Sequence, residues 1–199
     1  MSAVSLFFIG AVLLCNGLAL LGRIEPRGAA PVNAFVGVVL VAASAHLGVP
    51  KEATEADLVG AAGFLLFAIT YLWVALNAYT GHDASGLGWY CAWAAGVSIF
   101  LGLVTEIHLD DHKFALLWLL WAVLFAVFFL VIAQDRQDLV FAAGWLAIGE
   151  AIFTASGPGG LEMIGEWETL ATGWVVLATV IVLGGFALLA LRRRPVRAT

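Results

Sequence analysis

Charged residues are scarce in this sequence, and their scarcity indicates the class of protein. Asp, Glu, Lys and Arg together make up 12% of the 199 residues, whereas 63% of the residues are hydrophobic. A soluble domain carries about 25% charged residues, so this chain has too few to cover a surface that faces water. Lipid must surround most of the molecule, and the sequence therefore predicts an all-α integral membrane protein.

Other chemical groups are also few, and each shortage excludes a class of function. The formal net charge is −5 and no basic stripe is present, which excludes nucleic acid as a partner. Cys15 and Cys91 lie inside apolar runs, which is typical of small buried residues and not of a disulfide or metal site. No Ser/His/Asp grouping or metal-spaced His/Cys cluster is evident, so neither an enzyme nor a cofactor is expected. The only lysines, Lys51 and Lys113, fall in loops or at a loop edge and not in the last apolar run, which excludes a retinal Schiff base in the last helix.

Long apolar runs dominate the rest of the chain. A helix needs about 20 apolar residues to cross the hydrocarbon core of a membrane. Runs near that length cover residues 4–22, 30–48, 58–79, 87–106, 113–133 and 170–191, and a shorter run covers 139–155. The sequence SGPGG at 156–160 is a strong helix breaker and predicts the end of the shorter helix. We expect one transmembrane domain over 1–199, a bundle of seven helices, or of six if the shorter run does not cross.

Basic residues are shared unequally between the predicted loops. With seven spans, one set of loops holds seven of them: Arg23, Arg27, Arg136, Arg192, Arg193, Arg194 and Arg197. The other set holds only Lys51 and Lys113. The positive-inside rule makes the first set cytoplasmic, whereas six spans would move the C-terminal arginines outside and break the rule. The prediction is a multi-pass protein of the bacterial cytoplasmic (inner) membrane, with its N-terminus outside and its C-terminus inside.

Glu150 is the most informative polar residue, because an ionisable group inside a membrane is costly. It lies about 18 Å along its helix from Asp138, at 1.5 Å per residue, which is near or past the midplane. Three interpretations are open: a hydrogen-bonded group that holds helices together, a pore-facing group that meets a permeant, and a proton carrier. Asn16, Asn33 and Asn77 fit either helix–helix hydrogen bonds or a pore lining, and Asn33 also fits a helix cap.

Aromatic residues recur on one face of a predicted helix, in the run FALLWLLWAVLF. Phe114, Trp118, Trp121 and Phe125 are separated by four, three and four positions, a spacing that places them on one helix face. Trp121 lies about 12 Å into the bilayer at 1.5 Å per residue, too deep for an interfacial aromatic belt. Core packing or a pore lining explains it. A belt is expected for the tryptophans near predicted interfaces: Trp73, Trp89, Trp167 and Trp174.

A second aromatic pair, Phe67 and Tyr71, lies one helical turn apart on the third apolar run, with Thr70 beside it. A narrow slot lined by aromatic faces can hold a flat, neutral amide between them. A few hydroxyl, amide or carboxyl groups can then accept the N–H donors of the solute, which gives selectivity without tight binding. These residues favour a channel of this kind but do not identify its solute.

Several long stretches resemble the AmiS/UreI family of urea channels and amide transporters. The opening, LFFIGAVLLCNGLALLGRIEPRGAAPVNAFVG from Leu6, matches the family without gaps at Asn16-Gly17, Pro26 and Asn33-x-Phe35-Val36-Gly37. Four more stretches agree: GFLLFAITYLWVALN from Gly63, DDHK from Asp110, WLLWAVLF from Trp118 and WLAIGEAIFTA from Trp145. The similarity covers about residues 1–155, which leaves the run 170–191 as an extra C-terminal helix.

This resemblance implies a passive channel with a pore in each protomer, built from helix hairpins, and six protomers in a ring around a lipid-filled centre. By matched position it implies a pore lined by Leu6, Ile9, Leu13, Asn16, Phe67, Thr70, Tyr71, Trp118, Trp121, Phe125 and Glu150. The implied permeants are urea or short uncharged aliphatic amides, with a cytoplasmic amidase or urease as a functional partner. A proton-coupled secondary amide transporter that uses Glu150 is the alternative.

Three departures from the family's urea channels are visible. Phe125 stands where the acid-gated channels have a tryptophan, so the inner constriction has one N–H donor fewer. The loop 48–57 is short and has no histidine pair, which predicts a channel that acid does not strongly gate. His112 is left as the candidate pH sensor, beside Asp110 and Asp111, which should raise its pKa. The chain also continues past the usual end, which favours the amide-transporter branch.

Overall fold

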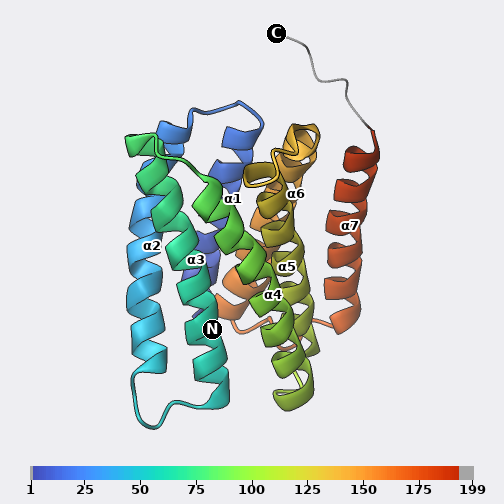
Figure 1. Cartoon of the computed structure of the whole chain (residues 1–199). Helices are drawn as coiled ribbons and strands as arrows, with labels where there is room; N and C mark the ends of the chain where they lie inside the picture. Colours follow the sequence, from blue (N-terminus) through green and yellow to red (C-terminus); the bar gives the residue numbers. More distant parts are fainter. Residues whose placement is uncertain (1, 193–199) are drawn as a thin grey trace.

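The computed structural model describes residues 2–192, and this part of the chain folds into seven long helices. Figure 1 shows them side by side: α1 (Ala3–Leu20), α2 (Pro26–Gly48), α3 (Glu55–Thr80), α4 (Ser85–His108), α5 (His112–Ile132), α6 (Val140–Thr154) and α7 (Thr172–Leu191). Two short turns, η1 (Gln137–Leu139) and η2 (Ala155–Leu161), flank α6. With these turns included, all seven are long and apolar enough to cross a membrane, which confirms the seven-span prediction over the described residues.

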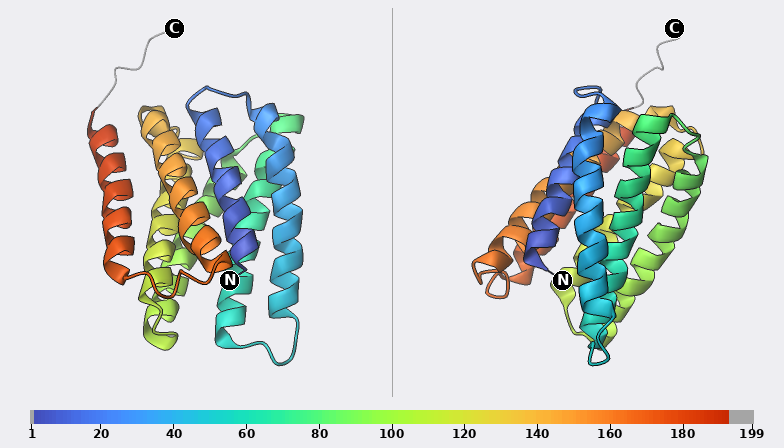
Figure 2. Two further views of the ribbon diagram at one scale, coloured as in Figure 1. Left: turned by 180° about the vertical axis from the view of Figure 1, so that it is seen from behind. Right: turned by 90° about the vertical axis from the view of Figure 1, so that its left-hand side faces the viewer.

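The helices alternate in direction between two ends of the bundle. The connections 21–25, 81–84 and 133–136 lie together with the end of α7, and we name this the α3–α4 end (Figure 1, Figure 2). The connections 49–54 and 109–111 lie with the segment 162–171 at the opposite, α2–α3 end. Of the basic residues used to predict orientation, Arg193, Arg194 and Arg197 lie outside the described residues.

Three pairs of helices pack most closely: α2 with α3, α4 with α5, and α1 with α6. The first two pairs are sequential hairpins, whereas the third joins helices that are far apart in the sequence. Glycine allows the close approach of α1 to α6, because a Cβ on Gly17 would lie only 2.8 Å from the carbonyl oxygen of Gly144. Small residues at such crossings are typical of membrane helices, whose association depends on packing and hydrogen bonds.

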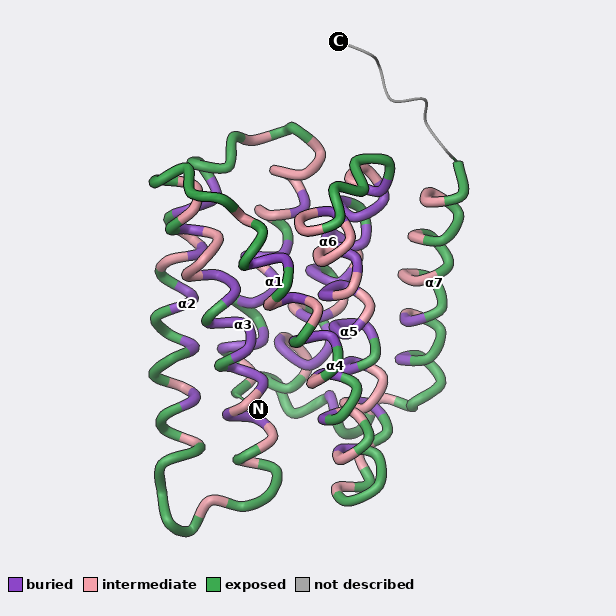
Figure 3. The backbone as a smooth tube through the Cα atoms, viewed as in Figure 1, coloured by how far each residue is buried: buried purple, intermediate pink, exposed green. Residues whose placement is uncertain are grey.

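Buried residues concentrate inside the bundle, and exposed residues surround them (Figure 3). Large apolar side chains such as Phe35 (74% exposed) and Ile107 (71% exposed) lie on the outer surface, as expected where the surrounding solvent is lipid. The helix α7 lies at the edge, against α5 and α6, and buries only Val175 and Thr179. It therefore adds little to the core.

The start of α2 differs from the prediction. The helix begins at Pro26 and not near residue 30. Proline is favoured in the first turn of a helix, because its missing N–H would have no partner there in any case. Asn33 consequently lies inside the helix, with its side chain fully buried, and the interpretation of this residue as a cap is wrong.

The SGPGG segment does not end the sixth helix, which is a second correction. Helical turns continue through η2, a π-helix that contains Pro158. Proline lacks the N–H that would continue the regular α-helical hydrogen bonding, and the helix departs from α-helical geometry at this point. Glycine then allows the turn to pack on α1, since a Cβ on Gly159 would meet the backbone of Phe7 at 2.8 Å.

The segment after η2 folds back over the start of α5 and is held there by Lys113. The Nζ atom donates hydrogen bonds to the carbonyl oxygens of Trp167, at 2.6 Å, and Glu168, at 3.2 Å. It also lies 5.2 Å from the ring centroid of Trp167, whose side chain is 1% exposed. The prediction that Trp167 belongs to an aromatic belt is therefore wrong, because the fold buries this ring against α5.

Candidate functional site

Five aromatic rings from α3 and α5 meet inside the bundle. Trp121 contacts Phe67 edge to face, with ring centroids 5.0 Å apart, and Trp118 in the same manner at 5.0 Å. Phe67 also contacts Phe125 at 5.3 Å and Tyr71 at 5.7 Å between centroids. All five rings are at most 1% exposed. The spacing of these residues puts them on the facing sides of two helices, and we name them the aromatic cluster.

Polar groups in and beside the aromatic cluster lack hydrogen-bond partners. Among residues 2–192, Trp121 Nε1, the Tyr71 hydroxyl and both carboxylate oxygens of Glu150 are buried without a partner. Glu150, on α6, is fully buried and lies near Tyr71. Buried polar groups are normally hydrogen-bonded. The interpretation of Glu150 as a hydrogen-bonded link between helices therefore finds no support in the described chain.

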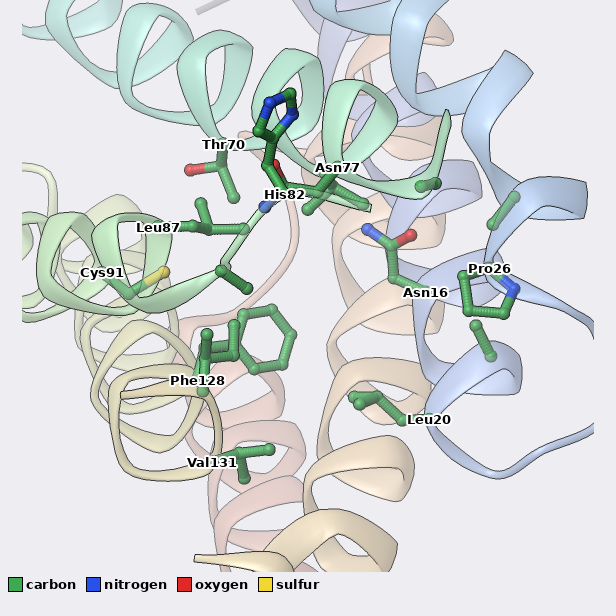
Figure 4. A pocket seen from close by; sticks show the side chains of 16 residues that line it. Asn16, Leu20, Pro26, Thr70, Asn77, His82, Leu87, Cys91, Phe128 and Val131 are labelled. Carbon is green, nitrogen blue, oxygen red and sulfur yellow. The ribbon is translucent and has the colours of Figure 1, made fainter. Parts of the chain in front are cut away.

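Cavities lie on both sides of the aromatic cluster. At the α3–α4 end, a cavity of about 390 Å³ lies between α1, α2, α3, α4 and α5, and we name it the vestibule (Figure 4). Thr70 lines it, one position before Tyr71 of the cluster. At the α2–α3 end, a cavity of about 80 Å³ is lined by Phe114 and Trp118. The aromatic cluster thus separates two cavities that lie toward opposite ends of the bundle.

The predicted residues of α1 lie on its buried face. Leu6, Ile9 and Leu13 are at most 1% exposed and pack in the same apolar core as the aromatic rings. Their spacing of three and four positions is that of one helix face. The structure therefore brings these three side chains into one core with the predicted aromatic residues of α3 and α5.

Asn16 lies one turn further along α1, where it lines the vestibule and pairs with Asn33 of α2. Asn33 Nδ2 donates to Asn16 Oδ1 at 2.7 Å, and Asn16 Nδ2 donates to Asn33 Oδ1 at 3.1 Å. Asn33 Nδ2 also donates to the carbonyl oxygen of Ala29 at 2.9 Å, which uses its second hydrogen. The pair links α1 to α2 and leaves one hydrogen of the Asn16 amide free of these bonds.

Several residues of the vestibule were not predicted as site residues. Asn77, for which a pore lining was one of the open interpretations, and His82, which no sequence pattern singled out, both line this cavity (Figure 4). The spacing of Thr70, Val74 and Asn77 is a signal that could have found them, because positions i, i+4 and i+7 share a helix face. The vestibule residues of α4 and of the end of α5 carry no comparable signal, because they lie within runs of apolar residues in the sequence.

His112 lies apart from the aromatic cluster, at the α2–α3 end. Its Nδ1 atom is 2.8 Å from a carboxylate oxygen of Glu106, and its Nε2 atom is 3.7 Å from Asp110. The side chain is 57% exposed. The acidic neighbours predicted from the sequence are present, but the nearest is Glu106, two residues before the end of α4.

Comparison with known proteins agrees with this geometry. The sequence pattern of the AmiS/UreI family transporters matches residues 1–166. The chain belongs to the AmiS/UreI family. This confirms the resemblance noted in the sequence and makes the protein a member of a transporter family.

Relatives of two kinds appear in the AmiS/UreI family. The chain is 40% identical to a Mycolicibacterium smegmatis protein provisionally named an amidate substrates transporter, over 96% of this chain and 88% of that protein. It is 32% identical to the acid-activated urea channel of Helicobacter pylori, over 81% of this chain and 97% of that protein.

A solved structure within the AmiS/UreI family has the same fold. The cryo-EM structure of the Helicobacter pylori urea channel in its closed state has a TM-score of 0.72 at 31% identity. That match covers 84% of this chain and 100% of the other. The family pattern ends at residue 166, before α7, whereas the match to the Mycolicibacterium smegmatis protein spans 191 residues and so includes α7.

Proposed function

We propose that this AmiS/UreI transporter is a passive channel for urea and small uncharged aliphatic amides. The observation that carries the proposal is the set of unpartnered polar groups in the aromatic cluster, between two cavities. The indole N–H of Trp121 can donate to an amide carbonyl, and the Glu150 carboxylate can accept amide N–H groups. Aromatic faces suit a flat neutral solute, while an ion would lose its hydration shell without recovering equivalent contacts.

The proposed pathway begins at the cavity lined by Phe114 and Trp118 and continues through the aromatic cluster. There Leu6, Ile9 and Leu13 of α1 supply apolar wall, and Glu150 supplies the acceptor. Past Tyr71 and Thr70 the pathway enters the vestibule, where Asn16 is a wall residue. In this proposal, Phe125 and Phe67 give the cluster its width, and neither cavity along the route is lined by a lysine or an arginine.

Purified protein in liposomes tests the proposal directly. After a hyperosmotic shock with urea or acetamide, liposomes shrink and then recover as the solute enters. We expect recovery to be at least about tenfold faster with the protein than in empty liposomes, and to slow in the Glu150→Gln variant. Equal recovery in protein-containing and empty liposomes, with correctly inserted protein, would refute the channel.

Proton-coupled transport is the second candidate, and the buried carboxyl of Glu150 is the observation that favours it. A coupled transporter would accumulate amide when a pH gradient is imposed. A passive channel equilibrates the solute and shows no accumulation. Measuring the final internal concentration of labelled acetamide, with and without the gradient, separates the two mechanisms.

We also propose an orientation, with the α3–α4 end toward the cytoplasm of a bacterial cell and α7 ending there. Arg23, Arg27 and Arg136 lie at that end, whereas Lys51 and Lys113 lie at the other. A cysteine introduced at Asp83 should resist an impermeant thiol reagent in intact cells, and one at Glu52 should react. The opposite labelling pattern would invert the orientation.

By resemblance to the family, we propose a homo-hexamer around lipid. The apolar outer surface fits either lipid or a neighbouring protomer. The native mass of the protein in lipid nanodiscs gives the number of protomers and so distinguishes the two. A mass of one protomer would refute the hexamer. A cytoplasmic amidase or urease is the proposed functional partner, because consuming the permeant would maintain its inward gradient.

A further inference from the structure

The vestibule contains hydrogen-bonding groups that the permeation pathway does not require. Asn77 Nδ2 is buried and has no hydrogen-bond partner within residues 2–192. Asn16 keeps one amide hydrogen beyond its pair with Asn33. Thr70 donates its hydroxyl hydrogen to the Leu66 carbonyl oxygen at 2.8 Å, which leaves the lone pairs of Oγ1 as acceptors. Two amide donors and one acceptor therefore border the same cavity.

Apart from His82, the rest of the vestibule wall is mainly apolar, and most of its large side chains come from α3, α4 and α5 (Figure 4). Leu87 and Val131 are buried, and Val74 and Phe128 are partly buried. All four line the cavity together with Asn16 and Asn77. At about 390 Å³ the cavity has the size of a small-molecule site, with many apolar side chains and few polar groups. Urea has no apolar part that could use this wall.

We propose that the vestibule is a binding site for primary aliphatic amides that carry an alkyl tail, and that it makes the channel prefer them to urea. The Asn77 and Asn16 N–H groups bind the amide carbonyl, Thr70 accepts an amide N–H, and Leu87, Phe128 and Val131 surround the tail. This inference rests on the proposed function and adds the substrate class that the channel favours.

The preference has a magnitude that can be measured. Each methylene group moved from water to an apolar wall increases occupancy by about fourfold. Propionamide should therefore permeate better, relative to urea, than its larger size alone allows. Because urea has no alkyl part for the wall to hold, a change in the wall should lower propionamide permeability more than urea permeability and so lower this ratio.

Valine-to-threonine variants test the site, because threonine has the shape of valine and adds a hydroxyl group. Val131→Thr and Val74→Thr change the vestibule wall on two different helices. Val127→Thr is the matched control, since Val127 is buried one turn earlier on α5 and does not line the cavity. The readout is the ratio of propionamide to urea permeability in one liposome preparation, which is independent of the amount of protein inserted.

We expect the ratio to fall about threefold in Val131→Thr and Val74→Thr and to stay constant in Val127→Thr. An unchanged ratio in both vestibule variants, with normal urea flux, would overturn the alkyl site and leave the proposed channel intact. An equal fall in Val127→Thr would also overturn it, as a general effect of the substitution. If liposomes with the wild-type protein took up urea and propionamide no faster than empty liposomes, the proposed function itself would be refuted.

Asn77→Leu provides an independent check of the polar half of the site. The leucine has a similar volume and no hydrogen-bond donor, so the carbonyl of the bound amide loses its partner. We expect the concentration of propionamide that half-saturates flux to rise about fivefold, while the fold, measured by thermal unfolding, is retained. A half-saturating concentration equal to that of the wild type would remove Asn77 from the site.

Discussion

Phe67 and Trp121 join α3 to α5 through an edge-to-face contact, with ring planes at 78° and centroids 5.0 Å apart. Trp118 contacts the same indole at 88°. Such contacts contribute about 0.5–1.5 kcal/mol each beyond the buried area, and they fix the direction of the Trp121 N–H. A donor that is held in place and has no partner in the described chain is suited to a passing carbonyl oxygen.

Trp121→Phe should therefore lower amide flux while preserving the aromatic cluster. The phenyl ring keeps most of the contact with Phe67 but offers no N–H donor. A hydrogen bond contributes about 0.5–1.5 kcal/mol net, so we expect a loss of about two- to tenfold in urea and acetamide permeability. Trp174→Phe is the control, because Trp174 is 64% exposed on α7. Equal flux in the wild type and in Trp121→Phe would show that the indole N–H does not meet the permeant.

Glu150→Gln should lower the flux of urea more than that of acetamide. Urea carries two NH₂ groups and can donate one hydrogen from each to the two oxygens of a carboxylate, whereas acetamide has a single NH₂ group. Glutamine keeps the shape but has only one acceptor oxygen. We expect the ratio of urea to acetamide permeability to fall about threefold. In Glu106→Gln, where the carboxylate is 46% exposed and lines neither cavity of the pathway, the ratio should not change.

If Glu150→Gln left both fluxes and the expression level unchanged, Glu150 would have a structural role despite its unpartnered oxygens. A loss of folded protein, measured by size-exclusion chromatography in detergent, would instead require the comparison to be made on the folded fraction alone. The ratio of two solutes in one preparation serves this purpose, because it does not depend on how much protein is inserted.

The aromatic cluster could be predicted from the sequence, because its residues follow the periodicity of single helices. The steps of four, three and four on α5 and of four on α3 brought the aromatic side chains onto facing surfaces. Helix number followed from hydropathy, since each span must satisfy its own backbone hydrogen bonds in lipid.

Features that depend on contacts between distant segments could not be predicted in this way. Trp167 looked like an interfacial residue because its burial depends on a backbone that turns back toward Lys113. From the sequence, Pro158 indicated a helix end. The prediction failed because the π-helical turn packs on α1, a contact that local sequence does not reveal. The vestibule draws on five helices and has no motif of its own.

External acid should change solute flux by less than about twofold between pH 5 and 7.5, the range in which an imidazole titrates. His112 is bound to Glu106 at an exposed position, and it lines neither the vestibule nor the cavity at Trp118. Its change of charge therefore alters a surface ion pair and not the pathway. Flux measured at both values in the same liposomes tests this expectation, and a tenfold rise at the lower pH that His112→Ala abolishes would contradict it.

Lys113→Met should loosen the segment 162–171 and destabilise the protein. The substitution leaves the carbonyl oxygens of Trp167 and Glu168 without their donor, and an unsatisfied buried group costs about 1–3 kcal/mol. We expect a lower thermal unfolding midpoint in detergent and greater quenching of tryptophan fluorescence by acrylamide as Trp167 becomes accessible. Glu168→Gln is the matched control: its carboxylate lies 3.5 Å from Lys113 but is 79% exposed. An exposed ion pair contributes about 0–1 kcal/mol, so this control should shift the midpoint far less. Equal shifts in the two variants would mean that the ion pair, and not the bonds to the backbone, holds the segment on α5.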